Sequence, residues 1–176
     1  MTLAWNVIGV VILAYAALVA RSIALAGFGL DSLIEIGAST VVLWELADVE
    51  SSRQHQAMRW IGVAFVSLAV YLAAQSTVVL VEGFRPHHSA LGITWTAVTA
   101  TVMFALAAGK SRTGAELGNR VLTTEGRVTL IDGILAVAVL VGLTLNALAG
   151  WWWADPLAGY VILFYALKEA RASLRH

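Results

Sequence analysis

The sequence predicts an all-α membrane protein with six transmembrane helices and both termini in the cytoplasm. Sixty per cent of the residues are hydrophobic and only 12% are charged, whereas a soluble domain carries roughly 25% charged residues. Three runs contain no Lys, Arg, Asp or Glu: Leu3–Ala20, Trp60–Val81 and Pro86–Gly109. Each is long enough to cross about 30 Å of hydrocarbon as a helix.

We place the six helices near Leu3–Ala20, Ser22–Leu46, Ala57–Val81, His88–Ala108, Arg120–Leu148 and Trp151–Leu167. The first is not a signal peptide, because it lacks a basic region before it and a second span follows it. The predicted links are short, namely "ADVESSRQHQ", "EGFRPHH" with Pro86 as its breaker, and "GKSRTGAELGNR". Residues 1–176 are therefore expected to form a single transmembrane domain, without a cytoplasmic C-terminal metal-binding domain.

The distribution of Lys and Arg predicts the orientation, because basic residues concentrate on the cytoplasmic side of a membrane protein. Only Arg21 and Arg85 lie on one side, and the other side has Arg53, Arg59, Lys110, Arg112, Arg120, Lys168, Arg171 and Arg175. The Trp151–Trp153 cluster is then expected at the outer interface, where indole rings anchor helices. We expect a cell membrane, either a plasma membrane or a bacterial inner membrane.

Two acids interrupt the second span. The stretch "GFGLDSLIEIGAST" contains Asp31 and Glu35, which lie one helical turn apart on one face. The span has about ten strongly apolar residues worth roughly −0.3 to −0.6 kcal/mol each, while two central acids cost roughly 2.5 to 3.5 kcal/mol each. These sums nearly cancel, so the acids must be sheltered from lipid inside the bundle.

A third acid, Asp132, lies inside the fifth span in "TTEGRVTLIDGILAVAVL". No Lys or Arg lies within the predicted spans to neutralise the three acids, and like charges in a low dielectric need protons or a bound cation. One interpretation is that the acids stay protonated and bond to Ser32, Thr129 or the backbone. The favoured one is a cation site that exchanges metal for protons, with hard oxygen ligands suited to Mn, Mg, Ca and, with some accommodation, Zn or Fe(II).

Three segments carry a family resemblance. "ALAGFGLDSLIEIGAST" resembles the second transmembrane helix of the cation diffusion facilitator family, "TTEGRVTLIDGILA" resembles its fifth helix, and "GWWWADPLAGYVI" resembles the start of its sixth. The spacing, the order and the six-span topology agree, so the resemblance covers nearly the whole membrane part. It implies export of a divalent metal such as Zn, Cd, Mn, Fe or Co, commonly against protons.

The resemblance also implies a four-ligand metal site on helices two and five. Asp31, Glu35 and Asp132 match three of these ligands, with Glu in place of the more usual Asp at position 35. Val128 stands at the fourth position, and valine cannot coordinate a metal. We expect water or a backbone carbonyl to take its place, and a His introduced at Val128 to reach the metal.

The predicted function is a secondary transporter rather than an enzyme, with Zn, Mn, Fe or a similar divalent cation as substrate and no organic cofactor. Its partners are the metal, protons and the lipid bilayer; a homodimer stays open, and the zero net charge gives no case for nucleic acid. The alternative is a non-transporting membrane metal sensor or accessory subunit that retains the fold. A third hypothesis is a facilitator for a different cation.

Other titratable residues lie in the links or near the interfaces. The absence of cysteine excludes disulfides and thiolate metal sites. An ordinary solvated role is favoured over a weak peripheral metal site for Asp48, Glu50, His55, His87 and His88. For Glu125 and Arg127, a solvated or paired role at the interface is favoured over a core role.

Overall fold

The structure is a computed structural model that describes the backbone of residues 2–46, 51–118 and 120–174. Within these ranges, the side chains of residues 2, 3, 38–46, 51–58, 120–125 and 127 lie outside the description. Six helices occupy the described residues: α1 (Thr2–Ala20), α2 (Ile23–Leu46), α3 (Ser51–Glu82), α4 (Ala90–Glu116), α5 (Arg120–Ala149) and α6 (Ala154–Leu174). The all-α class and the predicted number of helices are confirmed.

The predicted links are wrong in extent, because two of them are largely helical. Most of "GKSRTGAELGNR" belongs to α4, which continues to Glu116 and is followed by Gly118 in the left-handed region, at φ 62°. Likewise, α3 begins at Ser51, inside the predicted link "ADVESSRQHQ". Polar residues do not end a helix by themselves, and neither run contains a proline.

The start of α4 is set by a cap rather than by hydrophobicity. The Ser89 hydroxyl accepts a hydrogen bond from the Gly92 amide at 3.0 Å, so the helix begins at Ala90, two residues after the predicted start. Ser is a favoured N-cap because its oxygen satisfies an amide that has no partner within the helix.

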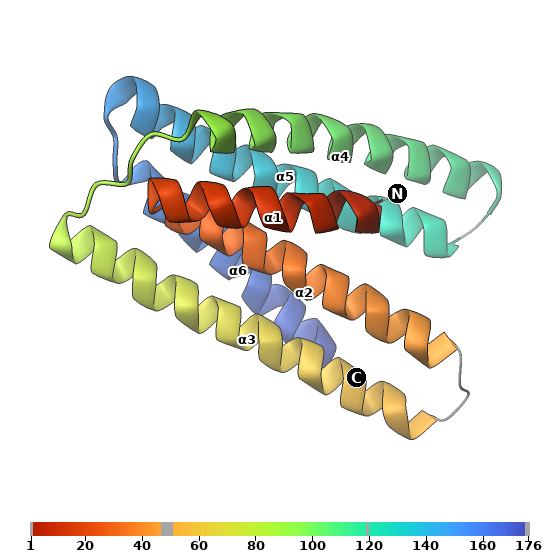
Figure 1. Ribbon diagram of the computed structural model, residues 1–176. Coiled ribbons are helices and arrows are strands. Elements are labelled where there is room, and N and C mark those ends of the chain that lie inside the picture. Colours follow the sequence, from red (N-terminus) through yellow and green to blue (C-terminus); the bar gives the residue numbers. More distant parts are fainter. Residues whose placement is uncertain (1, 47–50, 119, 175–176) are drawn as a thin grey trace.

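The helices form an elongated bundle in which α2 is central, because it packs against α1, α3, α5 and α6. Two long antiparallel pairs flank it, namely α4 with α5 and α3 with α6 (Figure 1). The start of α1 and the end of α6 lie toward the end of the bundle where α2 is followed by α3 and α4 by α5 (Figure 1). This arrangement agrees with the predicted topology, although the orientation across a membrane stays a prediction.

Two glycines allow helices to approach closely. A Cβ built on Gly27 of α2 would lie 2.6 Å from Leu72 Cδ2 of α3, and one on Gly142 of α5 would lie 2.9 Å from the Ala154 carbonyl oxygen of α6. Small residues at such contacts are the usual packing device of membrane helices. The glycines at these two positions therefore have a packing role.

The outer surface is apolar. Leu18, Val81 and Leu148 are 79%, 80% and 84% exposed, and this many large exposed apolar side chains indicates contact with lipid rather than water. Within the described residues, three helical stretches are long and apolar enough to cross a membrane, and Ala4–Ala20 is apolar but shorter; the three are Arg59–Glu82, Ala90–Glu116 and Val128–Ala149. The span count of six remains a prediction.

The tryptophan cluster lies in the short connection between α5 and α6. The rings of Trp151 and Trp153 stack at 5.1 Å between centroids, and the two side chains are 46% and 39% exposed. This partial exposure is compatible with the predicted interfacial anchor.

Candidate metal centre

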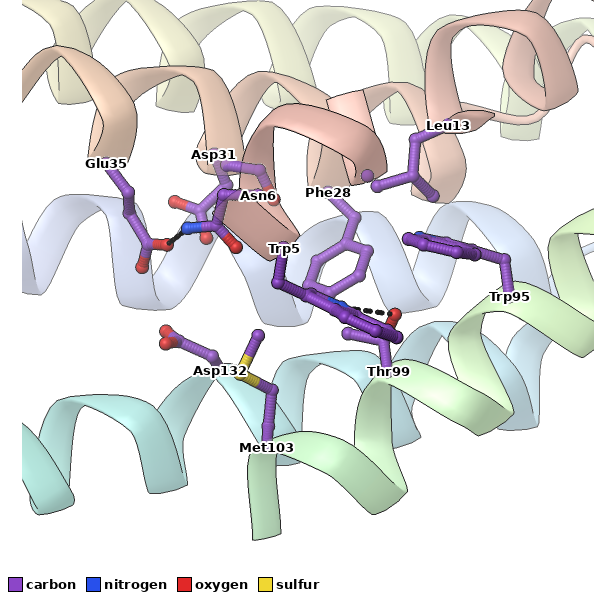
Figure 2. A pocket seen from close by; sticks show the side chains of 12 residues that line it. Trp5, Asn6, Leu13, Phe28, Asp31, Glu35, Trp95, Thr99, Met103 and Asp132 are labelled. Carbon is purple, nitrogen blue, oxygen red and sulfur yellow. Dashed lines mark hydrogen bonds between the residues drawn. The ribbon is translucent and has the colours of Figure 1, made fainter. Parts of the chain in front are cut away.

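A pocket inside the bundle brings the three predicted acids together. Asp31 and Glu35 reach it from α2, and Asp132 reaches it from α5 (Figure 2). Its space is small, of the order that one water molecule needs. The remaining lining residues are Trp5, Asn6, Gly9, Leu13, Phe28, Ser32, Trp95, Thr99 and Met103.

The acids are sheltered, as their insertion cost predicts. Asp31 is 8% exposed and Asp132 is 9% exposed, while Glu35 is half-buried. The four-residue spacing places Asp31 and Glu35 on one face of α2, and this face meets α1 and α5. The rest of the wall is mainly aromatic and aliphatic, so the carboxylates are the main charged groups that a bound cation would meet.

Asn6 was not predicted, and it is the polar side chain that α1 contributes to the pocket besides the Trp5 indole. Its Nδ2 donates to Glu35 Oε2 at 2.8 Å (Figure 2). Asn6 is 8% exposed. A lone amide within the charge-free run Leu3–Ala20 was the signal that could have identified it.

Glu35 of α2 and Asp132 of α5 line the same pocket and interact electrostatically. Asp31 also interacts electrostatically with both acids. Ionised carboxylates this close repel one another, and protons or a bound cation would relieve that repulsion.

Two further charged groups act on the pocket, and the sequence did not assign either to it. Lys110 of α4 donates from Nζ to Thr129 Oγ1 at 3.1 Å and interacts electrostatically with Asp132. Glu169 of α6 interacts electrostatically with all three acids. The sequence predicts no Lys or Arg within a span to neutralise the acids, whereas α4 extends through Lys110 instead of ending at Ala108, and Lys110 acts on Asp132.

Val128 does not lie on the pocket side of α5. Its side chain is 50% exposed and is absent from the pocket lining. Thr129, the next residue, is 2% exposed and faces α4 through its bond to Lys110. The rotation of α5 therefore turns position 128 away from the pocket, contrary to the expectation that a His there would reach the metal.

The described residues contain no group of three or more His, Cys, Asp or Glu side chains close enough to hold one metal ion. Asp31, Glu35 and Asp132 share the pocket, but they do not surround a single point. Coordination of one ion by all three carboxylates would therefore need their side chains to reorient.

The peripheral residues give no second centre within the described part of the chain. His87 and His88 are exposed, and the His87 amide donates to the Ala20 carbonyl at 2.8 Å. Asp48 and Glu50 lie outside the described residues, as do the side chains of His55, Glu125 and Arg127.

A fourth buried acid, Asp155, fixes the helix that carries two of the pocket acids. It is completely buried at the start of α6, and it accepts hydrogen bonds from the Ser22 hydroxyl, the Ile23 amide at 3.0 Å and the Ala24 amide at 3.5 Å. The Leu25 amide in turn donates to Ser22 Oγ at 3.1 Å. Asp155 thus caps α2 from another helix, where a carboxylate is favoured by unpaired amides and the helix dipole.

Together, the lipid-facing bundle and its internal acidic pocket define a polytopic membrane protein with the layout of a cation transporter, since intramembrane acids mark ion pathways. The chain belongs to the cation efflux family, because the model of the cation efflux transmembrane domain matches residues 59–176. This match includes Asp132 but not α1 or α2. At the family level, it relates the chain to metal cation transporters and not to catalytic enzymes.

The chain is also similar to a curated protein over more of its length. The alignment with transmembrane protein 163 of Xenopus laevis is 24% identical over 153 residues and covers 81% of this chain and 54% of the relative. The chain therefore spans about half the length of that relative.

Proposed function

We propose that this protein moves a divalent metal cation out of the cytoplasm in exchange for protons, with Asp31, Glu35 and Asp132 as metal ligands and proton carriers. The observation that carries this proposal is that buried carboxylates from α2 and α5 line one internal pocket. Family membership supports a metal cation as the substrate. Zn²⁺, Mn²⁺ and Fe²⁺ all belong to this class of divalent substrate.

The charge of the pocket suggests how the exchange is balanced. When ionised, the three carboxylates that line the pocket carry three negative charges, and the Lys110 and Glu169 groups that act on them are opposite in sign. One divalent cation or two protons would reduce the negative charge of the pocket by the same amount. The pocket could therefore alternate between a metal-loaded form and a doubly protonated form at similar electrostatic cost.

In the proposed cycle, all six helices span the membrane and both termini lie in the cytoplasm. Metal enters the deprotonated pocket from the cytoplasmic side, the bundle rocks to open outward, and protons displace the metal. Alternating access around a midplane site is a general scheme for such transporters. The central position of α2 supports this scheme, because a tilt of α2 would move two ligands relative to α5.

The test is metal uptake by sealed liposomes that contain the full chain, measured with a metal-sensitive dye. Glu35→Gln should abolish uptake of Mn²⁺ and Zn²⁺, because the amide cannot carry the proton or balance the metal charge. Glu116→Gln is the matched control, since Glu116 is exposed at the end of α4. Normal uptake by Glu35→Gln would reject this site.

A second candidate function is a membrane metal sensor or accessory subunit that binds metal without transporting it. Two features favour it, namely that Val128 stands where the family resemblance implies a fourth ligand and that the described carboxylates do not surround one point. Saturable metal binding to the purified chain, with no metal uptake into liposomes, would establish this function instead.

A further inference from the structure

We propose that Asn6 of α1 supplies the missing metal ligand, through its side-chain carbonyl oxygen, and makes the site selective for hard, oxygen-preferring divalent cations such as Mn²⁺. This inference rests on the proposed function and names the substrate class of the same pocket. It moves the fourth ligand from α5, where Val128 stands, to α1.

The placement of Asn6 carries the argument. Its side chain lines the same pocket as Asp31, Glu35 and Asp132, and only 8% of it is exposed. Nδ2 donates to Glu35 Oε2 at 2.8 Å (Figure 2). Because the amide oxygen shares a carbon with this nitrogen, Oδ1 is held within the same small space.

The chemistry of the amide fits a ligand role. A carboxamide offers two N–H donors and one carbonyl oxygen, so Asn6 can keep one donor on Glu35 while its oxygen faces an ion. A rotation about the last side-chain torsion exchanges the two ends, and this torsion is soft. Asn carbonyls are established oxygen ligands for hard cations.

Glu35 makes this geometry accessible. Its side chain is one methylene longer than Asp and extends from α2 to the amide on α1. Glu35 and Asn6 therefore form one contact between α2 and α1. The resulting set consists of three carboxylates and an amide oxygen, with no imidazole or thiolate. Such an all-oxygen set suits Mn²⁺ and Mg²⁺, whereas imidazole favours later transition metals such as Zn²⁺.

The experiment measures Mn²⁺ and Zn²⁺ affinity of the full chain in lipid nanodiscs at pH 8, with a melting curve for each variant. Asn6→Ala should weaken Mn²⁺ binding by about tenfold, equivalent to about 1.4 kcal/mol, and Zn²⁺ binding less. Asn6→Asp should retain Mn²⁺ binding, because it keeps an oxygen ligand. Asn6→His should shift the Zn²⁺-to-Mn²⁺ affinity ratio toward Zn²⁺ by about tenfold or more, again about 1.4 kcal/mol.

Asn146→Ala is the matched control. Asn146 is a buried amide of α5, 3% exposed, whose Nδ2 donates to the Pro86 carbonyl at 3.1 Å and which does not line the pocket. It should lower the melting temperature without changing the affinity ratio. If Asn6→Ala and Asn6→His behave in the same way, Asn6 is structural and the inference is overturned.

Asp132→Asn separates this inference from the proposed function. Loss of binding in Asp132→Asn, together with an unchanged metal preference in Asn6→His, would keep the acidic site and reject the Asn6 ligand. Full metal binding by Asp132→Asn would reject the acidic site itself and the Asn6 ligand with it.

Discussion

Lys110 Nζ of α4 lies 3.1 Å from Thr129 Oγ1 of α5, three residues before Asp132. This contact holds an ammonium group near the acidic pocket, where it interacts electrostatically with Asp132. The Lys110 ammonium would repel a metal ion that enters the pocket. After the metal ion leaves, the same positive charge would partly balance the carboxylates.

Lys110→Gln should therefore tighten Mn²⁺ binding at pH 8 by about tenfold. The ammonium repels a divalent ion twice as strongly as a monovalent one at the same distance, and a tenfold change in affinity corresponds to about 1.4 kcal/mol. Binding is measured by titration of the full chain in nanodiscs. Arg112→Gln, at an exposed position of the same helix, is the control and should leave the affinity unchanged. An unchanged affinity in Lys110→Gln would show that the ammonium does not act on the metal.

Metal affinity should fall steadily as the pH is lowered from 8 to 5. Carboxylates must be deprotonated to coordinate, so protons and metal compete for the same oxygens. The described side chains that act electrostatically on Asp132 include Asp31, Glu35, Lys110 and Glu169. Mn²⁺ titrations at several pH values check this prediction. A flat affinity over the whole range would argue against proton exchange at the pocket.

Asp155 and Ser22 should be energetically coupled. Each substitution, Asp155→Asn or Ser22→Ala, should destabilise the protein by about 1 to 3 kcal/mol, because it leaves buried polar groups of the α2 start without a partner. The double variant should lose less than the sum of the two single losses. Chemical unfolding in detergent, followed through the tryptophans, measures all three. Additive losses would mean that the two residues act independently.

Val128→His should not create a zinc site, contrary to the expectation from helix periodicity alone. Position 128 is half exposed and lies off the pocket lining, so an imidazole there would point away from the acids. Zn²⁺ affinity should stay within about threefold of wild type, a change well under 1 kcal/mol. A clear gain in Zn²⁺ affinity that disappears in Asp132→Asn would show that α5 rotates during binding.

The helices could be predicted because membrane burial imposes length and hydrophobicity on each segment. The sheltered position of the three acids could also be predicted, because a charged side chain inside an apolar membrane span is costly unless the protein shields it from lipid. Their shared pocket follows from the four-residue spacing of Asp31 and Glu35 and from the matching depth of Asp132 on α5.

The remaining features depend on how whole helices pack, which local sequence does not specify. Asn6 enters the pocket only because α1 packs against α2, and Lys110 reaches α5 only because α4 continues through a polar stretch. The side of α5 that carries Val128 depends on a rotation set by α4, whose contacts bury Gly126 and Thr129 instead. Asp155 was visible as part of a family motif, but its role as a cap for α2 needs the fold.

The most direct measurement is proton release during metal transport in weakly buffered, sealed liposomes that contain the full chain, with a pH dye and a metal dye recorded together. For wild type, the charge of the pocket predicts about two protons moved against each divalent ion. Asp132→Asn should abolish both signals, and Glu116→Gln should preserve both. Metal flux without counter-moving protons, or normal coupled flux in Asp132→Asn, would contradict proton-coupled exchange at Asp31, Glu35 and Asp132.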